Sequence, residues 1–202
     1  MKNFGQRFWS FISDRHSQTK KLLLDKTKKI VEIHYVDRYL FNPLSVALLA
    51  ELVMGLKTQS GPARWGLPKI SIETARNQNT GESYLSGAIW TDWSDSNLRD
   101  QILKYMLGSM SSQVQLQIEE KSALRHARIL EVFFDGGSSM TLRLDQGVSY
   151  WRAVTSNQDR FSKPWRFDFG LDPKKQGEML FATTLKVEGS AYPTEIFIKV
   201  RE

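Results

Sequence analysis

The stretch that decides the fold runs over residues 29–56, KIVEIHYVDRYLFNPLSVALLAELVMGL. Its first nine residues, KIVEIHYVD, are rich in β-branched side chains and bounded by charged residues, a pattern typical of a buried strand. Strict alternation along this strand places Ile30 and His34 on one side and Val31 and Ile33 on the other. The sequence therefore predicts one strand whose two faces differ in polarity.

A buried helix is predicted directly after this strand. Asn42 suits the N-cap of a helix and Pro43 suits its first position. The helix expected over 43–57 is apolar on nearly every side, which is typical of a helix enclosed by other elements. A strand, a short turn and a buried helix together indicate an α/β unit.

The remaining pattern extends this unit into an α/β domain with a mixed sheet and flanking helices. Beyond the opening strand and helix, apolar periodicity and turn residues predict one or two amphipathic helices over 3–24, strands near 69–74 and over 83–93, a helix up to Gly108, strands over 114–120, 128–134 and 139–145, and closing strands over 181–187 and 194–200. The turn DGGS at 135–138 predicts that two of these strands form a hairpin.

Composition limits the possible class of protein. The chain has 202 residues and no cysteine, which suits one domain of ordinary size and excludes a disulfide framework or a cysteine zinc site. The start of the chain is too charged for a signal peptide. No apolar run reaches the roughly 18–20 residues that a membrane span needs. We therefore expect a cytoplasmic protein.

Positive charge is concentrated near the beginning of the chain. Residues 1–34 carry eight basic and three acidic residues, a net +5, whereas the whole chain carries +6. Such a cluster attracts polyanions, although a charge run is also typical of a plain solvated face. The lysines expected to contact phosphate are Lys20, Lys21, Lys26, Lys28 and Lys29.

The same segment has an aromatic side. Phe4, Phe8 and Phe11 recur at helical spacing, and Trp9 lies beside them. We interpret this helix either as a docking arm for another protein or as part of the core. On the charge pattern, residues 1–28 form a basic amphipathic arm and residues 29–202 the α/β domain.

Motifs for nucleotide or metal chemistry are missing from the sequence. It has no Walker phosphate loop and no Rossmann fingerprint, and no histidine stands at metal-ligand spacing from a second ligand. We expect no cofactor and no metal.

One short motif, His126-x-Arg128, is similar to part of the His-x-Lys motif of phospholipase-D-type enzymes. In those enzymes the histidine attacks phosphorus and the lysine binds a phosphate oxygen. The position of the motif's aspartate is taken by Phe133, the nearest acid is Asp135, and no second copy occurs. Three interpretations stay open: a structural pair, a phosphate contact through Arg128, or catalysis in a dimer that pairs two copies of His126. We expect a protein that is not an enzyme.

Three blocks of the sequence resemble a known family. They are YVDRYL at 35–40 with its neighbouring strand, His126-x-Arg128 with DGG and LDQGVSYW, and FDFGLDP at 167–173. Over roughly 29–200 the chain resembles the phospholipase-D-like domain that follows the MIT domain in eukaryotic abscission proteins. Similar domains are attached to DEAD/DEAH-box helicases of bacterial phage-defence systems. The resemblance implies a degenerate phospholipase-D-like fold. The eukaryotic members bind acidic membranes, but Gln146 stands where their motif has arginine.

These observations favour a non-catalytic subunit that binds nucleic acid and protein beside a helicase or nuclease in a phage-defence or DNA-processing complex. Arg128 and Arg152 can bind phosphate. In proteins that bind single-stranded nucleic acid, bases stack on aromatic side chains. The aromatic and basic residues expected to cooperate are Tyr150, Trp151, Trp165, Lys163 and Arg166. Alternatives are a peripheral protein on acidic membranes, a phosphodiesterase or nuclease formed by dimerisation, and a subunit that only joins larger proteins.

Overall fold

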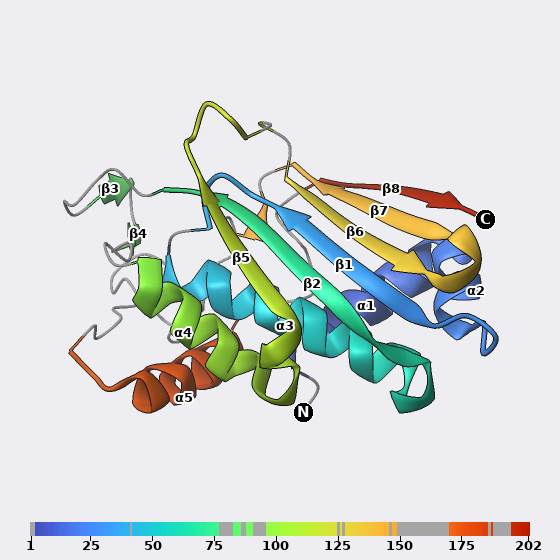
Figure 1. Cartoon of the computed structure of the whole chain (residues 1–202), viewed down its shortest axis with the longest axis horizontal. Helices are drawn as coiled ribbons and strands as arrows, with labels where there is room; N and C mark the ends of the chain where they lie inside the picture. Colours follow the sequence, from blue (N-terminus) through green and yellow to red (C-terminus); the bar gives the residue numbers. More distant parts are fainter. Residues whose placement is uncertain are drawn as a thin grey trace, which may run out of the picture.

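A six-stranded mixed sheet with helices packed against one face organises the chain (Figure 1). The structure is a computed structural model that describes residues 3–40, 42–76, 83–85, 88–90, 96–124, 126, 128–145, 147–148, 170–185, 187 and 195–202. Its helices are α1 (Phe4–Arg15), α2 (Ser17–Leu24), α3 (Pro43–Ser60), α4 (Ser96–Leu107) and α5 (Pro173–Thr184). Its strands are β1 (Ile30–Val36), β2 (Trp65–Ala75), β3 (Ser83–Leu85), β4 (Ala88–Trp90), β5 (Val114–Glu119), β6 (Ile129–Phe134), β7 (Ser139–Leu144) and β8 (Ile196–Arg201). The predicted α/β class and mixed sheet are confirmed.

Helix α3 is the centre of the helical layer. The side chain of Asn42 accepts a hydrogen bond from the backbone N–H of Ser45 at 2.8 Å, and Pro43 occupies the first turn, as predicted. Gly61 closes the helix with φ +81°, a backbone conformation that favours glycine. Because α3 packs against α1, α4 and α5 as well as the sheet, almost all of its side chains are buried.

The sheet has the order β5-β2-β1-β6-β7-β8. Strands β1, β2 and β5 are parallel, whereas β6, β7 and β8 join in antiparallel pairs that begin beside β1. The carboxyl ends of the three parallel strands therefore meet at one edge of the sheet, where β6 also begins. We call this edge, with the residues that directly follow β1, β2 and β5, the carboxyl edge.

The two faces of the sheet differ in burial. One face packs on the helices, and the other, on which no described helix lies, carries half-exposed polar residues; we call it the open face. The predicted alternation of β1 is wrong at its start, because Ile30 is buried together with Ile33 while Val31 is 42% exposed. A register irregularity between Ile30 and Glu32 shifts the side chains by one residue and puts His34 on the open face.

Helix α1 belongs to the same core as α3. The two helices touch through glycines, since a Cβ on Gly5 would lie 1.7 Å from the carbonyl oxygen of Glu51, and one on Gly55 would lie 2.4 Å from Gly5. The indole of Trp9 donates to the carbonyl of Leu52 at 2.7 Å. Helix α1 is therefore part of the core, which was one of the two interpretations of this segment. The boundary between an arm over 1–28 and a domain over 29–202 stays a prediction.

Two predicted strands need correction. The strand expected over 181–187 is wrong, because Asp172 caps a helix at the backbone N–H of Lys175 and Pro173 starts α5, which continues to Thr184. The strand was predicted because Thr183, Thr184 and Val187 are β-branched. In the helix, the hydroxyl groups of the two threonines donate to carbonyls of the preceding turn. The strand expected over 83–93 is a short β3–β4 pair separate from the six-stranded sheet.

Candidate functional site at the carboxyl edge

A buried carboxylate, Asp37, lies directly after β1 at the carboxyl edge. The hydroxyl of Tyr35 donates to its Oδ2 at 2.8 Å, and the backbone N–H of Tyr39 donates to its Oδ1 at 2.8 Å. Burial nevertheless raises the pKa of Asp37 above its usual range, against the effect of these donors. Burial and the neighbouring Asp37 also raise the pKa of Tyr35 well above its usual value. The acid therefore orders the start of the loop that follows β1.

Arg128, predicted as a phosphate contact, lies above Asp37. Its Nε is 3.5 Å from Asp37 Oδ1, and its Nη1 donates to the carbonyl of Asp145 at 2.7 Å. Gly147, with φ +65°, makes this approach possible, because a Cβ there would lie 2.3 Å from the Arg128 side chain and 2.6 Å from the Asp37 carboxylate. The Arg128 side chain keeps 14% of its surface exposed. The guanidinium is thus held in place at the surface.

Cationic side chains gather around Tyr39. The ammonium of Lys121 and the guanidinium of Arg128 each lie 5.0 Å from the centre of the Tyr39 ring, and the exposed His126 ring lies edge-on at 6.3 Å. Arg38 donates through Nε and Nη2 to the carbonyl of Leu124, which holds the turn after β5 against the turn after β1. We call Arg38, Tyr39, Lys121, His126 and Arg128 the edge cluster.

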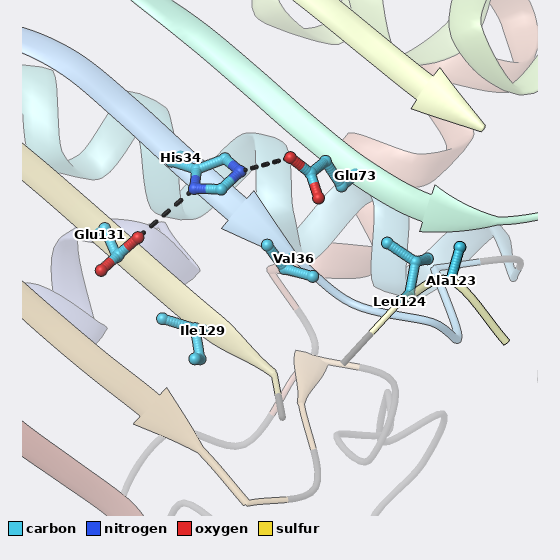
Figure 2. Close-up of a pocket in the computed structure, with 7 residues that line it drawn as sticks. All are labelled: His34, Val36, Glu73, Ala123, Leu124, Ile129 and Glu131. Atoms are coloured by element: carbon cyan, nitrogen blue, oxygen red, sulfur yellow. Dashed lines mark hydrogen bonds and ion pairs between the residues drawn. The ribbon is translucent and has the colours of Figure 1, made fainter. Parts of the chain in front are cut away.

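A pocket of about 360 Å³ opens on the open face beside the edge cluster (Figure 2). His34 stands between two carboxylates: its Nε2 is 2.9 Å from Glu73 Oε1 and its Nδ1 is 3.4 Å from Glu131 Oε2. Apolar side chains complete the lining on the side of the carboxyl edge, namely Val36, Ala123, Leu124 and Ile129. The three polar side chains keep between 26% and 33% of their surface exposed.

The pocket's chemistry is that of a hydrogen-bond acceptor. Ionised carboxylates only accept hydrogen bonds, and an imidazole with protons on both nitrogens can donate to Glu73 and Glu131 together. Among the described residues that line the pocket there is no serine, threonine or cysteine. Across the described residues, no group of three or more histidine, aspartate or glutamate side chains is arranged to hold a metal ion. The arrangement therefore suits recognition of a donor-rich ligand.

The lysines of the predicted phosphate-binding arm lie elsewhere. Lys20 and Lys21 lie in α2, and Lys26, Lys28 and Lys29 lie between α2 and β1, near the amino end of that strand. The edge cluster lies at its carboxyl end (Figure 1). The strand separates the two by about 20 Å. Among the predicted basic residues that the structure describes, Arg128 is therefore not brought together with Lys20, Lys21, Lys26, Lys28 and Lys29.

Three of the four aromatic side chains that were predicted to dock from the first helix are in the core. Phe4, Phe8 and Trp9 have no exposed surface, and Phe11 is half-buried under the guanidinium of Arg15, which lies 3.8 Å from its ring centre. Other predicted contacts lie outside the described residues: Tyr150, Trp151, Arg152, Lys163, Trp165 and Arg166.

Sequence reasoning did not single out the residues that shape the pocket. His34 appeared as one residue of a strand, and its partners Glu73 and Glu131 lie 39 and 97 positions away along the chain. Tyr39 and Lys121 were likewise not predicted as contacts. A partial signal exists, because Tyr39 and Lys121 lie in the turns that follow the parallel strands β1 and β5, where ligands of open α/β sheets bind.

None of the helices in the described ranges is both long enough and apolar enough to cross a membrane.

Comparison with known proteins gives a family for this domain. A search of the curated proteins found no significant match. The family model described as the C-terminal domain of the DEAD/DEAH box helicase YjiV matches residues 1–200, which include α1, the carboxyl edge and all of the sheet except the last residue of β8. Because this match covers nearly the entire chain, the chain belongs to the family of the YjiV-type DEAD/DEAH box helicase C-terminal domain.

Proposed function

We propose that this chain is a non-catalytic domain that binds nucleic acid at its carboxyl edge while it works with a DEAD/DEAH-box helicase. The family supports the association with a helicase-type protein. The observation that carries the nucleic-acid contact is the edge cluster, in which cations surround one tyrosine ring. Cationic side chains bind the phosphate backbone and an aromatic ring offers a stacking surface for a base.

Two features of the edge cluster support phosphate binding. Arg128 is anchored through Asp37 and the Asp145 carbonyl, so little side-chain freedom is lost when it contacts a ligand. Lys121 and His126 are exposed and lie against the same ring. Arg38 holds the neighbouring turn in place. The cluster therefore presents positive charge from a rigid support.

We propose a non-catalytic domain because of the geometry of the degenerate His126-x-Arg128 motif. His126 precedes β6 and Asp135 follows it, so the strand holds them at opposite ends. Asp135 is instead bonded to Lys29, whose backbone N–H donates to Asp135 Oδ1 at 2.7 Å. A histidine and an acid so placed cannot act on one phosphate.

The wider setting that we propose is a cytoplasmic DNA-processing or phage-defence complex. It rests on the resemblance to phospholipase-D-like domains attached to helicases of defence systems. The same resemblance includes eukaryotic domains that bind acidic membranes, so lipid is the competitor to test. The burial of Phe4, Phe8 and Trp9 removes the aromatic side chains that a membrane-surface helix would need.

Binding of fluorescent single- and double-stranded DNA by the purified chain, over a salt series and with acidic liposomes as competitor, tests the proposal. We expect affinity that falls steeply with salt and survives the liposomes, with a slope of roughly −0.7 to −0.9 per phosphate contacted. Arg38→Ala combined with Lys121→Ala should weaken it, and Lys20→Ala combined with Lys21→Ala is the matched control. Capture by liposomes without DNA binding would contradict the proposal.

A further inference from the structure

The pocket on the open face has a ligand chemistry that the edge cluster does not explain. Of the described residues that line it, two are carboxylates, one is the imidazole between them, and the others are apolar. Phosphate would be repelled by Glu73 and Glu131. A ligand for this pocket must instead carry hydrogen-bond donors that face the carboxylates and a flat or apolar surface that faces the apolar side chains.

The pocket and the edge cluster are joined by one short turn. Leu124 lines the pocket, and its carbonyl accepts the hydrogen bonds of Arg38. Lys121, three residues earlier, lies over the ring of Tyr39. A ligand that fills both places must carry a negative group a short distance from a neutral group rich in donors. A nucleotide has this composition, whereas an arginine- or lysine-rich peptide would be repelled by the edge cluster.

We propose that the pocket lined by His34, Glu73 and Glu131 binds an unpaired base of a nucleic-acid strand, with guanine preferred, while the edge cluster holds the adjoining phosphates. This inference rests on the proposed function and names the base that the same edge selects. Val36, Leu124 and Ile129 provide the apolar surface on which the base lies.

Guanine is preferred because of the donors along its pairing edge. Its ring N–H and its amino group are adjacent donors, and a carboxylate can accept both. Adenine and cytosine place an acceptor nitrogen beside their amino group, and thymine places carbonyls on both sides of its single N–H, so a carboxylate faces a lone pair in each. In Figure 2, the carboxylate oxygen of Glu73 that does not contact His34 points to the side of the pocket where Val36 and Leu124 lie. Each carboxylate oxygen also has two lone pairs, so Oε1 can bond to His34 and to a ligand.

The test uses the full chain and four labelled oligonucleotides of deoxythymidine that differ at one central position, which is dG, dA, dC or dT. We expect the dG strand to bind about tenfold more tightly than the all-dT strand, the discrimination typical of a bidentate contact to one base. Glu73→Gln should reduce this preference to less than about twofold, and it should not weaken binding of the all-dT strand, because phosphate contacts carry that affinity and Glu73 repels phosphate.

Control variants separate recognition from folding. Glu119→Gln changes an exposed acid on the open face outside the pocket and should keep the dG preference. Glu131→Gln gives a second variant of the pocket should Glu73→Gln unfold, which circular dichroism would report. Loss of the preference in either pocket variant, with Glu119→Gln unchanged, supports the proposal.

The failure of this inference differs from the failure of the proposed function. Equal binding of all four strands, or a dG preference that persists in both pocket variants, overturns base recognition by the pocket and leaves the nucleic-acid domain intact. Binding of no strand at any salt concentration overturns the proposed function and the inference with it. Binding of an arginine-rich peptide that Glu73→Gln abolishes, with no base preference, would assign the pocket to a protein partner and overturn the inference.

Discussion

The two ends of β1 both carry concentrated positive charge, but they use it differently. At the amino end, the guanidinium of Arg64 is buried and donates to the backbone carbonyls of Leu22, Leu23 and Lys28. At the carboxyl end, Arg128 is anchored by Asp37 and keeps its outer surface against Tyr39. Arg64 thus links backbone segments of the chain, whereas Arg128 keeps 14% of its side-chain surface exposed.

This difference is the reason that we place the proposed binding site at the carboxyl end rather than at the end with more lysines. The amino end has more lysines in sequence, yet Lys20, Lys21, Lys26 and Lys29 are exposed side chains along α2 and the following turn. The carboxyl end has fewer cations, but they converge on one aromatic ring beside a pocket. Convergence depends on strand order, which brings distant parts of the chain together.

The largest effect is expected at the amino end. Arg64→Met removes a buried donor from three carbonyls, and we expect it to lower the free energy of unfolding by about 3 kcal/mol, since hydrogen bonds to charged groups are strong and orphaned partners are costly. Urea unfolding measures this loss, and Arg64→Lys should recover part of it. A loss below about 0.5 kcal/mol, the usual range for surface changes, would show that the hydrogen bonds of Arg64 do not stabilise the fold.

A smaller loss is expected at the carboxyl end. Arg128→Met leaves Asp37 buried without its cation, and we expect a decrease of about 2 kcal/mol in the free energy of unfolding. Arg143→Met, on the neighbouring strand β7 with an exposed side chain, is the control and should change stability by less than about 0.5 kcal/mol. Equal losses in the two variants would contradict the special role of Arg128.

The two ends should respond to pH with opposite signs. Burial raises the pKa of Asp37, so its ionised form opposes folding at neutral pH and its contribution improves as pH falls through the raised pKa. Hydrogen bonds from Thr27 lower the pKa of Asp25, so Asp25 stabilises the fold above its usual pKa and loses this effect as pH falls.

Unfolding of Asp37→Asn and Asp25→Asn between pH 7 and pH 3 measures these signs. The stability of the wild type relative to Asp37→Asn should rise on acidification, whereas its stability relative to Asp25→Asn should fall. If both differences in the free energy of unfolding changed with pH in the same direction, the two acids would not differ in environment.

The smallest effect concerns single lysines in binding. Lys121→Ala should weaken single-stranded DNA binding about threefold and reduce the salt slope by about 0.7, the share of one phosphate contact. Lys20→Ala, at the amino end, should leave both quantities unchanged. Fluorescence anisotropy over a salt series measures both, and equal losses in the two variants would mean that binding follows bulk charge alone.

Local signals in the sequence predicted much of the fold. Asn42 and Pro43 located the start of α3, and the DGG turn located the β6–β7 hairpin, because caps and turns depend on neighbouring residues. The bulge at the start of β1 and the helical state of 181–184 were not predicted, since both depend on packing against distant elements.

The site was predicted only in part, for a physical reason. Arg128 was identified from a short motif, but its contact with Asp37 needs the space left by Gly147, which follows β7 and lies about 110 positions beyond Asp37 in the sequence. The pocket requires the order in which β2, β1 and β6 lie side by side, which gives His34 a carboxylate from each neighbour. Pairing of this kind is not visible in local periodicity.

The most direct test of the central claim is hydrogen–deuterium exchange of the chain with and without a saturating single-stranded oligonucleotide. If nucleic acid binds at the carboxyl edge, backbone amides over 37–40 and 120–124 should exchange more slowly in the complex, while those over 17–29 should not change. Protection confined to 17–29, with no change at the carboxyl edge, would contradict the account and return the binding site to the lysine-rich end.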